Sequence, residues 1–262
     1  MEQWWFNPVM FEIGPFKAHW YGFMYALSFI LGYLYLNYSK AGKRTELSTG
    51  QNDSFTIFVI LGVLLGGRLG YVLFYNLTYY LENPEKIMAV WEGGMSIHGG
   101  VIGVALALIW FSWKQKKSLL KLSDVVTAIA PLGIMFVRIG NFINAELYGR
   151  IAEKYCIYFP TDPANCRYPS QLLQAALEGL ILFIILYLIG RKTKIPGIIS
   201  SWFLILYGTF RIFAEFFREP DPQVGFLWNY ITEGQLLSFL MIVGGSLLLT
   251  LVYKKWYNKK TK

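Results

Sequence analysis

Seven stretches of the chain, each about 20 residues long, are apolar enough to cross a bilayer as a helix. Apolar residues make up 55% of the 262 residues and aromatic residues 18%, and the mean hydropathy is +0.41. These values exceed what a water-soluble domain of this length needs for its core. We therefore expect an all-α polytopic membrane protein that forms a single integral membrane domain. The seven spanning helices are expected near residues 17–38, 55–77, 95–113, 122–141, 170–190, 197–217 and 234–253.

The positive residues predict the topology of the chain. Of the 24 Lys and Arg residues, 15 fall into four clusters that occupy every second connection between the apolar stretches. The positive-inside rule assigns these connections to the cytoplasm, so the amino terminus is expected outside and the carboxyl terminus inside. The net charge of +8 does not indicate a nucleic-acid partner, because the positive residues form no single stripe interleaved with aromatics. The clusters consist of Lys40, Lys43 and Arg44; Lys114, Lys116, Lys117 and Lys121; Arg191, Lys192 and Lys194; and Lys254, Lys255, Lys259, Lys260 and Lys262.

The opposite connections are more acidic or more polar. Residues 78–94 carry Glu82, Glu85 and Glu92 against one Lys86. Residues 142–169 are long, polar and turn-rich, and we expect them to form a small extracytoplasmic cap loop. The first 16 residues lack the charged, apolar and cleavage-site order of a signal peptide, so the first span is expected to remain as an anchor.

Both cysteines of the chain, Cys156 and Cys166, lie in this cap segment. A disulfide is chemically permitted on the outer side of the membrane, and two unpaired thiols are an equally good interpretation. The two histidines, His19 and His98, are far apart and have no acid or thiol at ligand spacing, so we expect no metal site.

Three arginines, Arg68, Arg138 and Arg211, lie inside apolar stretches. A guanidinium cannot lose its proton to escape lipid, so each must face a polar interior. Fixed cations at membrane depth indicate an anionic partner, and a lipid phosphate is the commonest anion there. Each arginine is therefore a candidate functional residue.

His98 stands among five glycines in residues 93–103, at the outer end of the third apolar stretch. Glycine permits close backbone approach and unusual dihedral angles, so such a segment can line a cavity or let a substrate reach the chain. Imidazole is the side chain best able to take a proton near neutral pH, which makes His98 a candidate general base. A structural histidine is the alternative.

Arg138 and Asn141 are three residues apart near the end of the fourth stretch, and so share one helical face. A guanidinium able to bond in a bidentate manner then lies beside an amide that both donates and accepts, which is typical of an anion site. In the alternative interpretation, the pair ties the helix end to the cap and Glu146 neutralises the charge.

A polar stripe runs along the sixth stretch, where Tyr207, Arg211, Glu215 and Arg218 follow at intervals of four, four and three. Such a stripe indicates the wall of a water-filled cavity, in which Glu215 holds a guanidinium rigid for a phosphate. The alternative is a purely internal salt-bridge network between helices.

The glycines around Arg68 predict a close-packing seam, and this favours a supporting role for Arg68 over direct catalysis. Tyr71 and Tyr75 share the helical face of Arg68. Tyr21 and Tyr25 lie four residues apart in the first stretch, where they are either interface anchors or ligands.

A family match runs along nearly the whole chain. Its five segments, in order, are His19-Trp20-Tyr21-Gly22, residues 66–75, residues 93–100, residues 138–149, and residues 207–218 followed by Glu219-Pro220-Asp221. Together they resemble the prolipoprotein diacylglyceryl transferases of bacterial membranes, with residues 138–149 as the family hallmark.

This resemblance implies a multi-pass enzyme of the bacterial cytoplasmic membrane whose active site faces the outer leaflet. Such an enzyme moves the diacylglyceryl group of phosphatidylglycerol onto the lipobox cysteine thiol of a preprolipoprotein signal peptide, the first step of lipoprotein maturation. A thioether forms, glycerol phosphate is released, and no cofactor is implied.

The resemblance also implies roles for individual residues. Arg138 matches the phosphatidylglycerol-binding arginine, Arg211 a second essential arginine, and His98 the histidine proposed as base. A base suits a thiol nucleophile, and cations suit a departing phosphate. We expect catalytic roles for His98, Arg211, Tyr21, Tyr207 and Glu146, and substrate-binding roles for Arg138, Asn141, Gly149, Arg68, Glu215 and Arg218.

One segment departs from the family pattern. Where the family usually shows His-Pro-Ser-Gln-Leu-Tyr-Glu, this chain has Tyr168-Pro169-Ser170-Gln171-Leu172-Leu173-Gln174. A role of that second family histidine therefore cannot apply here, unless the Tyr168 hydroxyl serves as a hydrogen-bond donor instead.

Other functional classes fit parts of the sequence. A transporter or channel for an anionic solute also fits intramembrane arginines and Gly-rich spans, but the chain shows no convincing internal repeat. A retinal-type photoreceptor is excluded, because residues 234–253 contain no lysine for a Schiff base. A non-catalytic lipid-binding scaffold is the third possibility.

Overall fold

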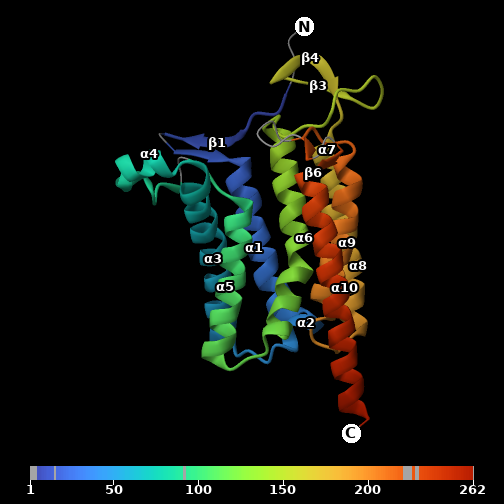
Figure 1. Cartoon of the computed structure of the whole chain (residues 1–262). Coiled ribbons are helices and arrows are strands. Elements are labelled where there is room, and N and C mark those ends of the chain that lie inside the picture. Colours follow the sequence, from blue (N-terminus) through green and yellow to red (C-terminus); the bar gives the residue numbers. More distant parts are fainter. Residues whose placement is uncertain (1–4, 15, 91–92, 221–225, 228–229, 262) are drawn as a thin grey trace. The chain divides into compact units, whose positions relative to one another are not determined.

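The structure is a computed structural model that describes residues 5–14, 16–90, 93–220, 226–227 and 230–261 (Figure 1). Residues 1–4 of the segment compared with a signal peptide lie outside the described residues, as do Glu92, Asp221 and Lys262 from the other predictions. The helices are α1 (Trp20–Tyr38), α2 (Lys40–Lys43), α3 (Thr49–Tyr75), α4 (Leu77–Glu82), η1 (Pro84–Lys86), α5 (Ile97–Gln115), α6 (Leu119–Ile143), α7 (Ser170–Gln174), the π-helix η3 (Ala175–Ile181), α8 (Leu182–Lys192), α9 (Ile198–Glu215) and α10 (Glu233–Lys260).

Six helices of the described chain are long and apolar enough to cross a membrane. They are α3, α5, α6, the continuous segment α7–η3–α8, α9 and α10. These six coincide with the second to seventh predicted spans, so a multi-pass helical membrane protein is confirmed. The first predicted span forms α1, which has 19 residues, carries five tyrosines and is not among the six.

Two helices extend well beyond one predicted end, by six residues in α3 and seven in α10. α3 begins at Thr49 rather than near residue 55, because Ser48 and Gln51 form a capping box: Ser48 Oγ accepts from the Gln51 amide at 3.3 Å, and the Ser48 amide donates to Gln51 Oε1 at 3.0 Å. α10 continues to Lys260 instead of ending near residue 253. Lysine is a good helix former, so a basic tail can extend a helix beyond its apolar part.

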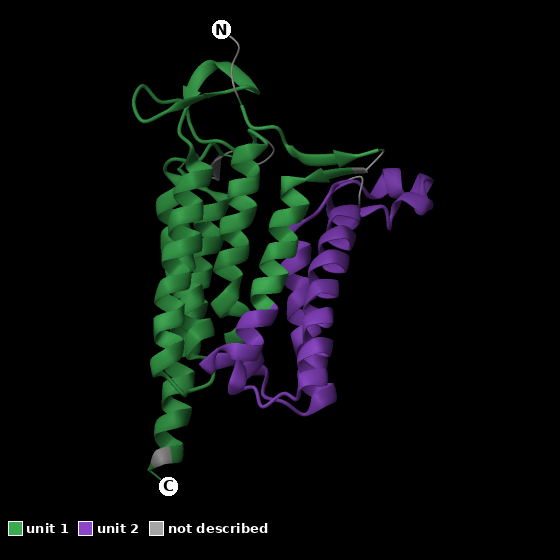
Figure 2. Ribbon diagram, turned by 180° about the vertical axis from the view of Figure 1, so that it is seen from behind, with its two compact units in different colours: residues 1–32, 124–262 green, residues 33–123 purple. Residues whose placement is uncertain are grey.

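The chain divides into two compact units (Figure 2), whose boundaries fall inside α1 and α6. Unit 1 comprises residues 1–32 and 124–262, and unit 2 comprises residues 33–123.

Within unit 2, α3 packs against α5 through glycines of both helices. A Cβ atom added to Gly66 would lie 2.8 Å from the Gly103 Cα atom and would also meet the Gly99 carbonyl oxygen. A Cβ atom added to Gly70 would lie 2.7 Å from the Gly99 Cα atom. Real side chains do not tolerate such contacts with backbone, so the predicted close-packing seam is confirmed.

Within unit 1, Asp124 of α6 holds the start of α9. Its Oδ2 accepts from the Gly197 amide at 2.7 Å, and its Oδ1 accepts from the Ser200 amide and hydroxyl, both at 2.8 Å. The first amides of a helix have no partner within the helix, and a carboxylate is favoured at that end by the helix dipole. Asp124 therefore fixes where α9 begins relative to α6.

In the described part of the chain, three two-stranded antiparallel hairpins accompany the helices. They are β1 (Val9–Ile13) with β2 (Phe16–His19), β3 (Ile157–Phe159) with β4 (Asp162–Arg167), and β5 (Phe226–Leu227) with β6 (Ile231–Thr232). The β3–β4 hairpin lies in the predicted cap segment. Trp5 packs beside it, with its ring 5.3 Å from those of Phe142 and Phe159.

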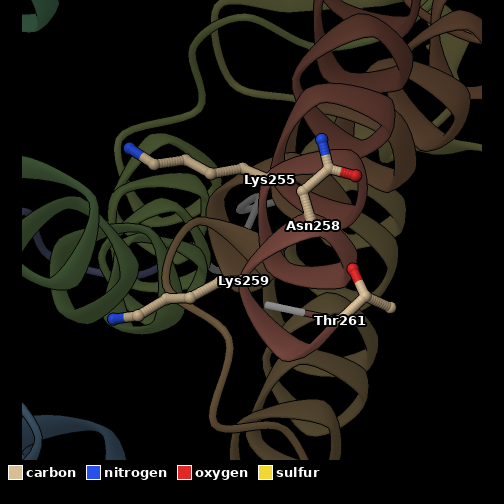
Figure 3. A pocket seen from close by; sticks show the side chains of 4 residues that line it. All are labelled: Lys255, Asn258, Lys259 and Thr261. Atoms are coloured by element: carbon tan, nitrogen blue, oxygen red, sulfur yellow. The ribbon is translucent and has the colours of Figure 1, made fainter.

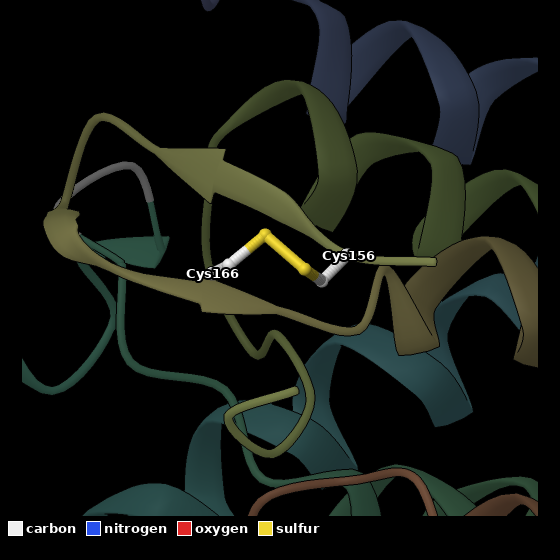
Figure 4. Close-up of a disulfide and its surroundings, with 2 residues drawn as sticks. All are labelled: Cys156 and Cys166. Atoms are coloured by element: carbon white, nitrogen blue, oxygen red, sulfur yellow. A yellow bond between two sulfur atoms is a disulfide. The ribbon is translucent and has the colours of Figure 1, made fainter. Parts of the chain in front are cut away.

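Cys156 and Cys166 are joined by a disulfide across this hairpin, with their Cα atoms 5.3 Å apart (Figure 4). The sequence left pairing and free thiols equally open, and the structure decides for pairing. The bond closes the hairpin covalently beside the Asp162–Arg167 ion pair of β4. A covalent staple is useful here because a short hairpin alone is only marginally stable.

Candidate active site

Three members of the predicted polar stripe lie on α9, whereas the fourth, Arg218, lies three residues beyond the end of this helix. Glu215, the last residue of α9, is the centre of the group. Glu215 Oε1 lies 2.6 Å from the Arg211 guanidinium and 3.2 Å from that of Arg218. Glu215 Oε2 accepts from the Thr232 hydroxyl at 2.8 Å, at the first turn of α10. The Glu215 side chain is only 1% exposed. Both of its oxygens are therefore satisfied, and one carboxylate orients two arginines.

Arg211 also reaches the segment α7–η3. Gln174 Oε1 accepts from Arg211 Nη1 at 2.8 Å, and Glu178 Oε1 lies 3.6 Å from the same nitrogen. The guanidinium is thus fixed from two helical segments, which restricts its orientation more than a single ion pair would.

Arg138 lies on α6 and differs from Arg211 in its partners. Among the described residues, Arg138 donates one long hydrogen bond of 3.4 Å to Asn141 Oδ1. Among the residues that the structure describes, no carboxylate lies within ion-pair distance of Arg138. Arg138 is nevertheless close enough to Arg211, Glu178 and Tyr207 to interact with them electrostatically. The cluster therefore contains a cation whose charge has no direct carboxylate partner in the described chain.

Asn141 links Arg138 to the cap segment. Its side chain is buried, and its Nδ2 donates to Glu146 Oε1 at 2.8 Å. Tyr21 of α1 is close enough to hydrogen bond with Asn141 and with Tyr25. Glu146 contacts the amide and makes no ion pair with Arg138, so Arg138, Asn141 and Glu146 form a short chain of contacts rather than a neutralised pair.

Tyr207 belongs to the same cluster. It lies within electrostatic reach of Glu178, Arg211 and Arg138, and its ring stacks on Phe203 at 5.6 Å. The stacking fixes the ring, and the phenolic group interacts with the charged side chains of the cluster.

Gly149 owes its identity to a close approach of three chain segments. Its amide donates to the Tyr168 carbonyl at 2.8 Å, and a Cβ atom added there would lie 2.8 Å from the Tyr168 Cβ atom and would also meet the Phe217 carbonyl oxygen. The next residue, Arg150, donates from its amide to the Phe217 carbonyl at 2.9 Å and from Nε to the Arg218 carbonyl at 3.0 Å. Gly149 and Arg150, at the end of the family hallmark, therefore contact or hydrogen bond to the chain directly after α9.

Unit 1 thus holds nine of the eleven predicted site residues, and unit 2 holds the other two, His98 and Arg68. His98 lies in the first turn of α5, after the helix cap Ser96, whose hydroxyl accepts from the Gly99 amide at 3.2 Å. The His98 side chain is exposed, and no described residue hydrogen bonds to its ring.

Arg68 is only 1% exposed, and its charge is taken up by backbone. It donates to the carbonyl oxygens of Ile87 at 2.8 Å, Lys86 at 2.7 Å and Gly94 at 3.2 Å, and also to that of Gly93. These bonds fix the loop after η1. They match the expected supporting role of Arg68 more closely than a role in binding substrate.

A pocket at the far end of α10 is separate from this cluster. It is lined by Lys255, Asn258, Lys259 and Thr261, and the two lysine side chains point the same way (Figure 3). Thr232, which contacts Glu215, caps the opposite end of α10, about 35 Å away at 1.5 Å per helical residue.

The comparison with protein families decides the identity of the chain. Residues 8–251 match the family described as prolipoprotein diacylglyceryl transferase. The chain belongs to this family.

Relatives named phosphatidylglycerol--prolipoprotein diacylglyceryl transferase support the membership over nearly full length. The protein of Azospirillum brasilense is 46% identical over 245 residues, which cover 91% of both chains. That of Geobacter sulfurreducens is 45% identical over 251 residues, covering 95% of this chain and 96% of the relative. That of Buchnera aphidicola subsp. Acyrthosiphon pisum is 42% identical over 276 residues, covering 97% of both.

The structure adds residues to this family member's candidate site that the sequence predictions missed. Gln171, Gln174 and Glu178 are fully buried on the segment α7–η3. Glu178 could have been found from the sequence in the same way as the arginines, because it is an ionisable residue inside an apolar stretch. Gln171 and Gln174 precede it by seven and four residues, on the same helical side.

Proposed function

We propose that this member of the prolipoprotein diacylglyceryl transferase family transfers the diacylglyceryl group of phosphatidylglycerol to the lipobox cysteine thiol of preprolipoproteins. Family membership and relatives at 42–46% identity support the reaction. The single structural observation that supports the site is Arg138, a cation without a carboxylate partner among the described residues, within electrostatic reach of the fixed Arg211.

The chemistry is a displacement at carbon. The cysteine thiol loses its proton, and the thiolate sulfur attacks the sp³ glycerol carbon that carries the phosphate ester. A carbon–sulfur bond forms while the carbon–oxygen bond breaks, and the electron pair leaves on glycerol phosphate. The demanding part is the charge that develops on the leaving phosphate, which arranged cations stabilise.

Arg138 is assigned to the phosphate because its guanidinium makes fewer hydrogen bonds and ion pairs with described residues than that of Arg211. Its contact with Asn141 orients it without neutralising it. Arg211 is assigned to the developing charge from a fixed position, since Glu215 and Gln174 already hold its guanidinium. Because these groups are set before substrate arrives, little reorganisation is needed during the reaction.

His98 is assigned as the base that takes the thiol proton. Its ring is exposed in the first turn of α5, and no described residue hydrogen bonds to it. Tyr21, Tyr207 and Glu146 are assigned to orienting the arginines and the substrate, through contacts with Asn141 and with the cations.

The membrane arrangement is part of the proposal. α1 is the seventh spanning helix, since its 19 residues carry no charged side chain. The basic clusters support a cytoplasmic carboxyl terminus and an outside amino terminus. A disulfide in residues 142–169 supports placing this segment, and the active site beside it, on the outer side of the cytoplasmic membrane.

The test combines the purified protein with phosphatidylglycerol vesicles and a lipobox peptide. We expect mass spectrometry to find a diacylglyceryl adduct on the peptide cysteine, together with released glycerol phosphate. A peptide with serine in place of that cysteine is the matched control and should stay unmodified. Flux of an anionic solute through the vesicles without any adduct would contradict the proposal and favour a transporter.

A further inference from the structure

Three buried side chains near the arginine cluster carry polar atoms without a hydrogen-bond partner in the described chain. Gln171, Gln174 and Glu178 are each 0% exposed. Among the described residues, no group hydrogen bonds to Gln171 Oε1, to Gln174 Nε2 or to either carboxylate oxygen of Glu178. Buried polar atoms are almost always satisfied by protein, water or ligand. Four unsatisfied atoms on one short segment therefore indicate that something else completes them.

The local backbone supports this conclusion. Glu178 lies within η3, a π-helix of seven residues that interrupts the helix between α7 and α8. π-helical turns are rare and are often found at functional sites, because they change the direction in which side chains project.

These atoms lie beside the proposed phosphate site. Gln174 already uses its Oε1 to hold Arg211, so its unpaired Nε2 belongs to the same amide. Glu178 lies 3.6 Å from the Arg211 guanidinium and within electrostatic reach of Arg138. A ligand whose phosphate binds these arginines would therefore place its neighbouring atoms near Gln174 and Glu178.

The unpaired atoms specify the chemistry of that neighbour. A carboxylate accepts hydrogen bonds only and repels a phosphate, so the group next to it must donate. Gln174 Nε2 donates, so the same group must also accept. A hydroxyl does both, whereas an ammonium group donates only and would leave the Gln174 amide unpaired.

We propose that Glu178 and Gln174 bind the terminal hydroxyls of the glycerol headgroup and thereby select phosphatidylglycerol over lipids that lack them. In this arrangement a headgroup hydroxyl donates to the Glu178 carboxylate, and Gln174 Nε2 donates to a headgroup hydroxyl oxygen. This inference rests on the proposed function, because it concerns the leaving group of that reaction.

The experiment compares two lipids with the same acyl chains, phosphatidylglycerol and phosphatidylpropanol, which has no headgroup hydroxyl. For the unaltered protein we expect kcat/KM to be about 100-fold higher with phosphatidylglycerol, since a lost hydrogen bond leaves a buried charged group unsatisfied. In Glu178→Gln the preference should fall to a few-fold, because the rate with phosphatidylglycerol drops far more than the rate with phosphatidylpropanol. Phosphatidylethanolamine should be a poor substrate for both proteins.

Controls separate recognition from structure. Lys259→Gln, at the exposed far end of α10, should keep the full preference. A second measurement uses only the unaltered protein: glycerol phosphate should inhibit at about 100-fold lower concentration than propyl phosphate. This comparison holds even if Glu178→Gln does not fold. Together with the lipid assay, it shows whether the site recognises the hydroxyls on a free phosphate as well as on a lipid headgroup.

Several outcomes would overturn the inference. Equal rates with phosphatidylglycerol and phosphatidylpropanol would do so, as would equal inhibition by the two soluble phosphates. A Glu178→Gln variant that loses the same factor with both lipids would assign Glu178 to holding Arg211 instead. If the unaltered protein forms no adduct from phosphatidylglycerol, the proposed function itself fails, and that result is distinct from a loss of headgroup preference.

Discussion

Arg211 and Glu215 form an ion pair of 2.6 Å across one turn of α9, and the Glu215 carboxylate is only 1% exposed. The same carboxylate also binds Arg218 and Thr232. Removing one partner of a buried ion pair leaves the other charge uncompensated, which costs more than the pair contributed. The pair therefore links the orientation of a proposed catalytic cation to the stability of the α9–α10 connection.

The first prediction follows from this pair. Glu215→Gln should lower the free energy of unfolding by about 3 kcal/mol and should also slow transfer, because Arg211 and Arg218 lose their shared carboxylate. Denaturation in detergent micelles and the peptide adduct assay measure the two effects. Glu219→Gln is the matched control, since that carboxylate is 47% exposed and should change stability by less than about 1 kcal/mol. Equal effects of the two variants would refute the assignment.

Arg138→Ala should reduce kcat/KM on the order of 100-fold or more, because one charge contact to the leaving phosphate is lost. Arg138→Lys should recover only part of this loss, since an ammonium group lacks the planar fork of donors. Single-turnover transfer to the lipobox peptide measures both. Arg191→Ala removes an exposed arginine from the end of α8 and should leave the rate within a few-fold. Near-normal transfer by Arg138→Ala would remove phosphate binding from this residue.

His98→Gln should slow single-turnover transfer on the order of 100-fold or more, because glutamine cannot accept the thiol proton as imidazole does. The matched control is His19→Gln, which changes the chain's other histidine, an exposed residue of β2, and should transfer normally. If His98→Gln keeps a near-normal rate, the base role has to be abandoned.

The glycine seam of unit 2 gives a prediction about packing. Gly66→Ala should destabilise the protein by about 1–3 kcal/mol, because the new methyl group meets α5 backbone that cannot move aside cheaply. Gly50→Ala, in the first turn of the same helix, places its methyl group in open space and should be neutral or stabilising by about 0.5–1 kcal/mol. Thermal unfolding of the two variants in the same detergent separates them. Similar melting temperatures for both would argue against the seam.

The ion pair of the cap hairpin predicts a dependence on pH. The hydrogen bond from Arg167 and the attraction of its charge lower the pKa of Asp162. A carboxyl whose pKa is lowered by folding adds stability above its unfolded pKa of about 3.9, and this stability is lost as the pH falls through the lower folded value. Asp162→Asn should therefore speed amide exchange in β3 and β4 at pH 7, and the difference from the unaltered protein should shrink below about pH 3.9. A difference that does not depend on pH would contradict this origin.

Local spacing made part of this structure predictable. Tyr207, Arg211 and Glu215 share one face of α9 because intervals of four do so on any helix. Arg138 and Asn141 contact each other for the same reason. Arg218 lies three residues beyond the end of α9 and still reaches Glu215. Long apolar runs likewise located the six described helices that are long and apolar enough to cross a membrane.

Pairing between distant segments was less accessible. Sequence spacing left the state of Cys156 and Cys166 open, since either pairing or two free thiols suits a polar loop. Glu178 stands in an apolar run, but its position against Arg211 depends on a π-helical turn. Hydrophobic periodicity does not reveal such a turn. A segment that is apolar on all sides shows no periodic pattern, so a change from α-helical to π-helical spacing leaves no trace in the sequence.

The π-helix η3 also makes the length of this segment a constraint in its own right. A residue deleted within 175–181 would let the wide turn relax to ordinary α-helical geometry, and each residue of an α-helix turns the chain by about 100°. The side chains within the turn, Glu178 among them, would then project in other directions relative to Gln171 and Gln174. Variation in this stretch is therefore expected to exchange one residue for another far more readily than to add or remove one.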